Sequence, residues 1–110
     1  MIIGGGCFLL GFNPAIPREV ITQYLDSRPE IQNWYSIFPG QIFIASDRPP
    51  RELSELIRGA FPSPLFILTH VDRNDCGGWL PEDAWDFIKQ ADRQPGLTAS
   101  LARTLTKNER

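Results

Sequence analysis

Residues 33–61, NWYSIFPGQIFIASDRPPRELSELIRGAF, constrain the fold more than any other part of the sequence. Two runs of mainly aromatic and β-branched residues, 33–38 and 41–46, flank Pro39 and Gly40. Proline presets the first φ angle of a tight turn, and glycine permits a positive φ at the next position. The pattern therefore predicts a β-hairpin.

A helix is predicted directly after the hairpin, in the segment RPPRELSELIRGAF. Asp47 or a neighbouring residue is expected to accept hydrogen bonds from the first amide groups of the helix, and a proline fits its first turn. The apolar positions share one face, which indicates that this helix packs on a sheet: Leu53, Leu56, Ile57 and Ala60.

Two further strands and two further helices complete the pattern. Residues 7–12 and 65–71 are apolar at nearly every position, which is typical of strands buried on both faces. Residues 17–27 and 79–90 have helical spacing, and each segment has a proline near its start. In the first of these helices the apolar face consists of Val20, Ile21, Tyr24 and Leu25.

The order strand, helix, strand, strand, helix, strand, helix predicts an α+β fold. It is the ferredoxin-like βαββαβ two-layer sandwich with a C-terminal helix added, and its first and third strands are expected at the centre of the sheet. We expect residues 1–94 to form one ferredoxin-like domain. Residues 95–110 form a C-terminal tail, either a short docked helix or a frayed one.

Composition restricts the partners. The chain has 110 residues and a formal net charge of −2, which gives no basic footprint for nucleic acid. No apolar run approaches the roughly 18 residues of a membrane span, and the start of the chain lacks the pattern of a signal peptide. Cys7 and Cys76 do not make a disulfide framework, so free thiols and a cytoplasmic location are expected.

The strands predict more apolar surface than two helices can cover. Phe8, Leu10, Phe43, Phe66 and Leu68 are expected on one face of the sheet, and Cys7, Leu9, Ile42, Ile44, Leu65 and Ile67 on the other. Two helices cover one face only, so a second copy, the third helix or the tail must cover the other. We therefore expect a homodimer, and the candidate binding or interface residues are Phe8, Leu10, Trp34, Phe43, Phe66 and Leu68.

Metal-capable side chains follow the last strand at His70, Asp72, Asp75 and Cys76. Their segment, VDRNDCGG, has ordinary turn composition, so a structural turn is preferred over a metal site. His70 alone is an alternative candidate for a general base. No catalytic residue, metal or cofactor is predicted, and Trp79 and Trp85 are expected to be structural, with Trp79 packing back on the third helix.

Part of the chain resembles a family of small bacterial proteins labelled SinR-like. The similarity covers residues 32–90 and is carried by Trp34, QIFIASD, PPRELSELI, LFILTHV and, most specifically, GGWLPEDAWDFI. The resemblance implies a ferredoxin-like dimer, distantly similar to the small endoribonuclease of CRISPR adaptation. In those nucleases an acidic residue at the end of the first strand holds a divalent cation. Asn13 stands nearest to that position here, and its amide lacks the negative charge that Mg²⁺ requires.

These observations favour a non-catalytic binding or assembly module that acts as a homodimer. The alternative is a metal-dependent endoribonuclease, against which the replacement of the acidic residue by Asn13 argues. A third hypothesis is a small-molecule or regulatory metal-binding domain that uses the turn after the last strand.

Overall fold

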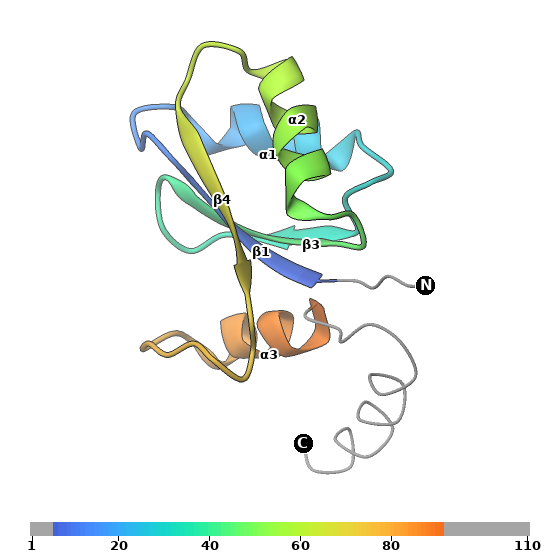
Figure 1. Ribbon diagram of the computed structural model, residues 1–110. Helices are drawn as coiled ribbons and strands as arrows, with labels where there is room; N and C mark the ends of the chain where they lie inside the picture. Colours follow the sequence, from blue (N-terminus) through green and yellow to red (C-terminus); the bar gives the residue numbers. More distant parts are fainter. Residues whose placement is uncertain (1–5, 92–110) are drawn as a thin grey trace.

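The computed structural model describes residues 6–91 of the chain. This part contains four strands and three helices, and Figure 1 shows them as one body with helices on both sides of the sheet. The predicted tail, residues 95–110, lies outside the described residues. The elements are β1 (Gly6–Phe12), α1 (Arg18–Asp26), β2 (Asn33–Tyr35), β3 (Gln41–Ser46), α2 (Pro50–Ala60), β4 (Phe66–Val71) and α3 (Glu82–Ala91).

All four strands belong to one antiparallel sheet with the order β2-β3-β1-β4. The two central strands are therefore β3 and β1, and β4 forms one edge. In the register Phe8 lies opposite Ile44 on one side and opposite His70 on the other. The predicted α+β class is confirmed at this level, as a small domain with an antiparallel sheet and three helices.

The main core lies between the sheet and the two helices α1 and α2. Burial of these apolar side chains supplies the dominant favourable term in folding, and Leu53 of α2 and Ile44 of β3 are fully buried. Figure 1 shows both helices on the same face of the sheet. The buried members of this cluster are Phe8, Leu10, Phe12, Ile21, Leu25, Ile31, Ile42, Ile44, Leu53 and Ile57.

Both helices lie close to their predicted positions, with two differences in detail. Val20 is 47% exposed, whereas Thr22 is buried and donates its hydroxyl hydrogen to the carbonyl oxygen of Glu19. The apolar face of α1 therefore runs through Ile21 and Leu25 rather than Val20. The prediction that Asp47 caps α2 is wrong, because Pro49 occupies the N-cap position and no side chain caps the helix there.

The hairpin between β2 and β3 has a longer connection than predicted. β2 ends at Tyr35, and the hydroxyl of the next residue, Ser36, donates a hydrogen bond to the carbonyl oxygen of Gln41, 2.7 Å away. The turn itself is as predicted: the Gln41 amide donates to the Phe38 carbonyl oxygen, and Gly40 has a φ of 78°. This geometry is that of a type II turn, which requires a positive φ at its third residue.

Gly40 also joins the turn to the end of β1, and this arrangement leaves no room for a side chain. The amide of Phe12 donates to the carbonyl oxygen of Gly40, 2.8 Å away. A Cβ atom at residue 40 would lie 2.7 Å from the carbonyl oxygen of Phe12. Glycine is therefore required at this position by both the backbone angle and the close contact.

Replacing Gly40 by alanine is expected to lower the free energy of unfolding by about 1 to 3 kcal/mol, from the strained φ and the contact with Phe12. Urea unfolding followed by circular dichroism would measure the change. The matched control is Gly59→Ala in α2, where no atom lies within 4 Å of an added Cβ. The control should stabilise the protein by about 0.5 to 1 kcal/mol. Equal midpoints for the two variants would contradict the assigned role of Gly40.

The third helix, α3, covers part of the opposite face of the sheet (Figure 1). Ile88 and Ala91 pack against Cys7 of β1 and Ala45 of β3, and all four residues are buried. The ring of Phe87 stacks on that of Tyr35, with centroids 5.8 Å apart. The expectation that the third helix covers some of the second face is therefore met. The half-buried members of this second cluster are Phe43, Val71, Leu80, Trp85 and Phe87.

Candidate binding surface

The part of the second face that α3 leaves uncovered carries several apolar side chains, and the exposed polar residues Thr69 and Gln41 lie in the same rows of the register. Ile67 is 68% exposed, and Leu65, two residues before it, is 87% exposed. Leu9 and Phe43 are half-buried and lie opposite each other in the register of β1 and β3. Gly11 lies opposite Ile67, and a Cβ added at Gly11 would lie 3.3 Å from Cγ2 of Ile67, so the Ile67 side chain lies over the glycine. We call Leu9, Phe43, Leu65 and Ile67 the open patch.

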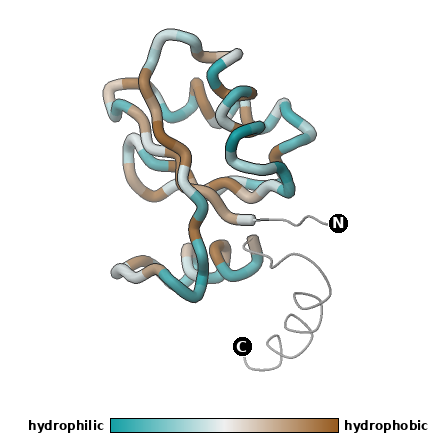
Figure 2. The backbone as a smooth tube through the Cα atoms, viewed as in Figure 1, coloured by the Kyte–Doolittle hydropathy of each residue, from teal (hydrophilic) through white to brown (hydrophobic). Residues whose placement is uncertain are grey.

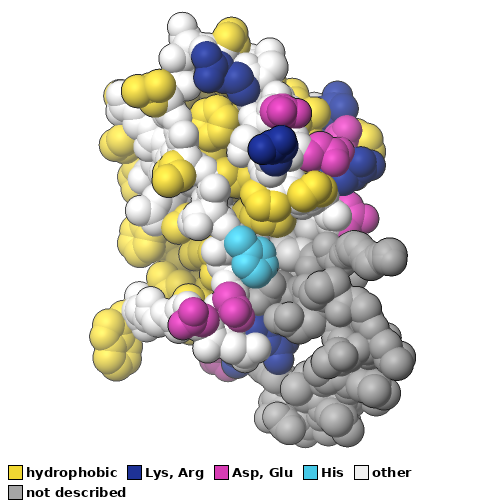
Figure 3. Space-filling view, viewed as in Figure 1, with side chains coloured by type: hydrophobic (Ala, Val, Ile, Leu, Met, Phe, Trp, Pro, Cys, Tyr) yellow, Lys and Arg dark blue, Asp and Glu magenta, His cyan; other side chains and the backbone are white. Residues whose placement is uncertain are grey.

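The open patch contains no charged side chain, and this chemistry restricts what can cover it. In the space-filling view, hydrophobic side chains gather on the left-hand side, between the sheet and the loop before α3 (Figure 3). Scattered apolar side chains are normal on a protein surface, whereas contiguous ones mark a site of interaction. The patch is therefore suited to another apolar surface.

The structure divides the six predicted interface residues between two faces of the sheet. Phe8 and Leu10 are buried under α1 and α2, at 3% and 1% exposure, and are not accessible to a partner. Phe66 and Leu68 are half-buried against the same core. Only Phe43 lies on the face of the open patch.

The predicted grouping of the two faces is therefore wrong in β3. Ile42 and Ile44 share the face of Phe8 and Leu10, because the register places Leu10 opposite Ile42 and Phe8 opposite Ile44. Phe43 accordingly points the other way.

Trp34 is half-buried against the main core rather than on the open patch. Its ring nitrogen donates a hydrogen bond to Oδ1 of Asp26, 2.7 Å away, at the end of α1. The indole therefore packs its apolar area under α1 while its single donor is satisfied by a carboxylate. The contact fastens the edge strand β2 to α1, which gives Trp34 a structural role.

The four metal-capable residues after β4 belong to a strand end and a turn. The ring of His70 meets that of Phe8 edge to face, with centroids 5.6 Å apart. Oδ1 of Asp72 accepts a hydrogen bond from the Asn74 amide, and its carbonyl oxygen accepts one from the Asp75 amide. Cys76 is exposed. Within residues 6–91 no group of three or more histidine, cysteine or acidic side chains is arranged to hold a metal ion.

Asn13, at the end of β1, organises the turn into α1. Its side-chain oxygen accepts a hydrogen bond from the Ala15 amide at 2.9 Å, and its carbonyl oxygen accepts one from the Ile16 amide. Asparagine commonly folds back on its own backbone in this way. The side chain of Asn13 is thus part of a turn at the end of β1.

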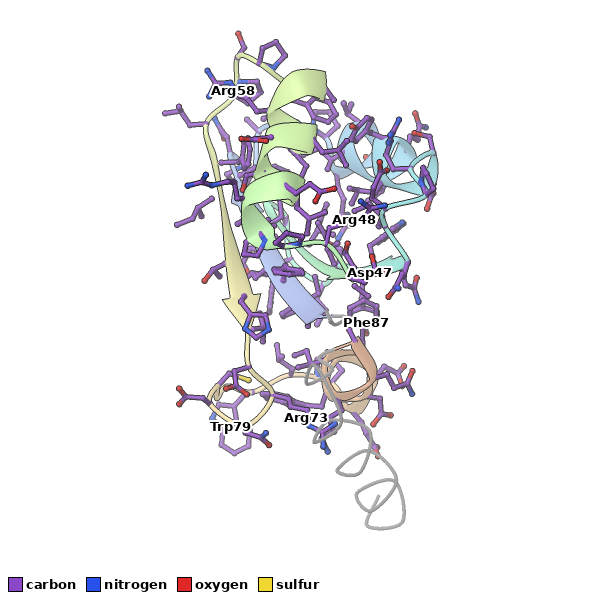
Figure 4. All side chains as sticks on the ribbon, turned by 45° about the vertical axis from the view of Figure 1, so that its right-hand side comes forward. Asp47, Arg48, Arg58, Arg73, Trp79 and Phe87 are labelled. Atoms are coloured by element: carbon purple, nitrogen blue, oxygen red, sulfur yellow. The ribbon has the colours of Figure 1, made fainter. Side chains whose placement is uncertain are left out.

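The two tryptophans near α3 have different roles. Trp85 packs against the second cluster, as expected of a structural residue. Trp79 is 98% exposed, so the prediction that it packs back on the helix is wrong. In Figure 4 its ring projects from the loop before α3. The two glycines before it place no side chain against which the ring could pack.

An ion pair between Arg28 and Glu30 lies in the loop between α1 and β2, with the two charged groups 3.0 Å apart. The hydrogen bond from Arg28 holds the pKa of the Glu30 carboxyl below its ordinary value of 4.5. The carbonyl oxygen of Glu30 also accepts a hydrogen bond from the hydroxyl of Ser46 at 2.6 Å. These contacts secure the loop to the end of β3 and lie apart from the open patch.

Comparison of the chain with protein-family models, with curated proteins and with solved structures finds no match in any of the three. Among the described residues, no helix is both long and apolar enough to cross a membrane.

Proposed function

We propose that this chain is a non-catalytic binding or assembly module that acts as a homodimer through the open patch. The observation that carries the proposal is the exposure of Leu65 and Ile67, at 87% and 68%, beside the half-buried Leu9 and Phe43. A twofold pairing brings the same apolar patch of two chains together and requires no other molecule. The absence of charge in the patch supports this pairing, because no buried charge has to be compensated.

The arrangement of the elements supports a ferredoxin-like assignment for the module. Residues 6–71 follow the order βαββαβ, and α1 and α2 lie on one face of a sheet ordered β2-β3-β1-β4. We propose a ferredoxin-like two-layer sandwich to which α3 adds cover on the second face. The resemblance of residues 32–90 to SinR-like proteins agrees with this assignment, and dimerisation is the property that it implies.

A binding role is favoured over a nuclease role by the chemistry at the end of β1. Asn13 is neutral, and its side-chain oxygen already accepts the hydrogen bond of a turn. A hard divalent cation needs charged oxygen ligands that the residue does not supply. Two cysteines without a disulfide framework favour the cytoplasm as the place of action.

The proposal is tested by the mass of the protein in solution at several concentrations, measured by light scattering. The wild-type chain is expected at twice its own mass, and Ile67→Glu is expected to be monomeric because it places a charge in a desolvated contact. Val20→Glu is the matched control, since Val20 is an exposed aliphatic residue on α1 and lies outside the open patch. A monomeric wild type that keeps its fold at high concentration would refute the dimer.

A further inference from the structure

A groove of about 660 Å³ runs between α2 and the edge strand β4. One side of it comes from the start of β4 and the two residues before it, and the other side comes from the last two turns of α2. In Figure 2 hydrophobic residues predominate in the first half of β4, and hydrophilic residues are frequent in the neighbouring α2. Two charged residues, Glu55 and Arg58, and two exposed aliphatic residues, Leu65 and Ile67, are among those that line it.

The strand that borders the groove has an unused edge. β4 pairs only with β1, so within residues 6–91 no strand bonds to its outer side. The strand is six residues long, FILTHV, and contains neither a proline nor a lysine. Proteins usually protect such an edge with these residues, with a bulge or with a covering segment, because free amide and carbonyl groups bind another extended chain.

The helix wall of the groove carries one acidic and one basic side chain. Glu55 and Arg58 both line it, and no ion pair with another described residue involves either of them. Arg58 lies near the end of α2, and Figure 4 shows it beside the loop that leads into β4. The groove therefore presents a cation at the start of β4 and an anion about one helical turn away.

From this geometry we propose that the groove binds an extended peptide as an additional strand on β4, a mode known for other proteins with an exposed sheet edge. The inference rests on the proposed role as a binding module and names the class of partner. The peptide runs antiparallel to β4, like every other pair in this sheet. Its C-terminal end then lies at the start of β4, where its terminal carboxylate or an acidic side chain meets Arg58.

The alternation of side chains along a strand defines the rest of the peptide. Successive side chains point to opposite faces, so one set meets α2 and the other continues the face of Leu65 and Ile67. The first set carries a basic residue opposite Glu55, followed two positions later by the carboxylate opposite Arg58. The second set is aliphatic, because it extends the apolar surface of β4.

The probe is the peptide Thr-Val-Thr-Val-Lys-Val-Asp, with fluorescein on its N-terminal amine and a free C-terminus, titrated into the wild-type protein and followed by fluorescence anisotropy. Saturable binding is expected. A peptide of the same composition with Lys and Asp exchanged is expected to bind about five- to tenfold more weakly, because both charges then meet like charges. A peptide with alternate amides methylated should not bind, because it cannot complete the strand ladder.

The matched variant is the double reversal Glu55→Lys with Arg58→Glu, at two exposed positions of α2. It is expected to exchange the preference, so that the charge-exchanged peptide binds more tightly than the original one. Unchanged preference in this variant, or equal binding of the methylated peptide, would overturn the proposal. An absence of saturable binding would also overturn it. A change in the mass of the free protein caused by the charge reversal would overturn it as well, because a second copy of the chain would then occupy the groove. The dimer is judged separately, by the mass of the free Ile67→Glu variant.

Discussion

Replacing Leu53 by alanine is expected to lower the free energy of unfolding by about 2 to 5 kcal/mol. Leu53 is fully buried and lies in the core between α2 and the sheet. Its shortening removes apolar contacts and leaves a cavity that the surrounding strands and helices fill only in part. Urea unfolding at fixed protein concentration would measure the change, because self-association adds to apparent stability.

Leu56→Ala provides the control for this measurement. Leu56 has the same side chain and lies in the same helix, but it is only half-buried. The loss should be clearly smaller than for Leu53, since part of the removed surface is already in contact with water. Equal losses would show that Leu53 is no better buried than Leu56, which would contradict the assigned position of α2 on the sheet.

Replacing Ile88 by alanine is expected to lower the free energy of unfolding by about 2 to 4 kcal/mol. Ile88 is 2% exposed and packs from α3 onto Cys7 and Ala45, which belong to the two central strands. We expect a single unfolding transition at a lower urea concentration, because the second cluster shares these strands with the main core. Far-ultraviolet circular dichroism and tryptophan fluorescence should report the same midpoint.

Lys89→Ala, at the exposed position next in sequence, should change stability by no more than about 0.5 kcal/mol. Hydrogen exchange distinguishes the outcomes for Ile88→Ala. Loss of protection in α3 alone, with unchanged protection in β1 and β3, would show that α3 folds and unfolds independently of the sheet. That result would contradict the role of α3 as cover for the second face.

The sequence predicted the order of the elements well because their boundaries coincide with strong local signals. Pro39 and Gly40 specify a turn whose third residue requires a positive φ, and the structure has this turn. Pro17 and Pro50 lie at or beside the helix starts. Such signals act over a few residues, so they can be identified without knowledge of the remainder of the fold.

The assignment of side chains to the two faces was wrong in β3, for a physical reason. Residues 42–45 are apolar at every position, so no polar residue marks which side of β3 faces water. A shift of one residue in register moves every side chain to the other face. The observed register places Phe43 opposite Leu9, and it depends on how β3 meets β1, a strand about 30 residues away in sequence.

The candidate binding surfaces could not be predicted from the sequence, because they are formed by the tertiary arrangement of the elements. Leu65 and Ile67 resemble core residues in the sequence, and their exposure follows from the edge position of β4 and from the limited reach of α3. The groove beside Arg58 exists only because α2 returns along that edge. An exposed Trp79 was likewise not predictable, since an indole beside a helix start usually packs against it.

The central position of β1 has a consequence for the synthesis of the chain. β1 is synthesised before the other described elements, yet one of its two neighbours, β4, comes more than 50 residues later. Until β4 arrives, the backbone of β1 has an unpaired side, and the core residues Leu10 and Phe12 lack the cover of Leu68 and Phe66. Pairing between distant segments is slow because the intervening loop must close first. The sheet therefore cannot be completed during translation until β4 is synthesised. A chain that stops before residue 66 leaves one side of β1, a central strand of the complete sheet, unpaired and its apolar side chains exposed.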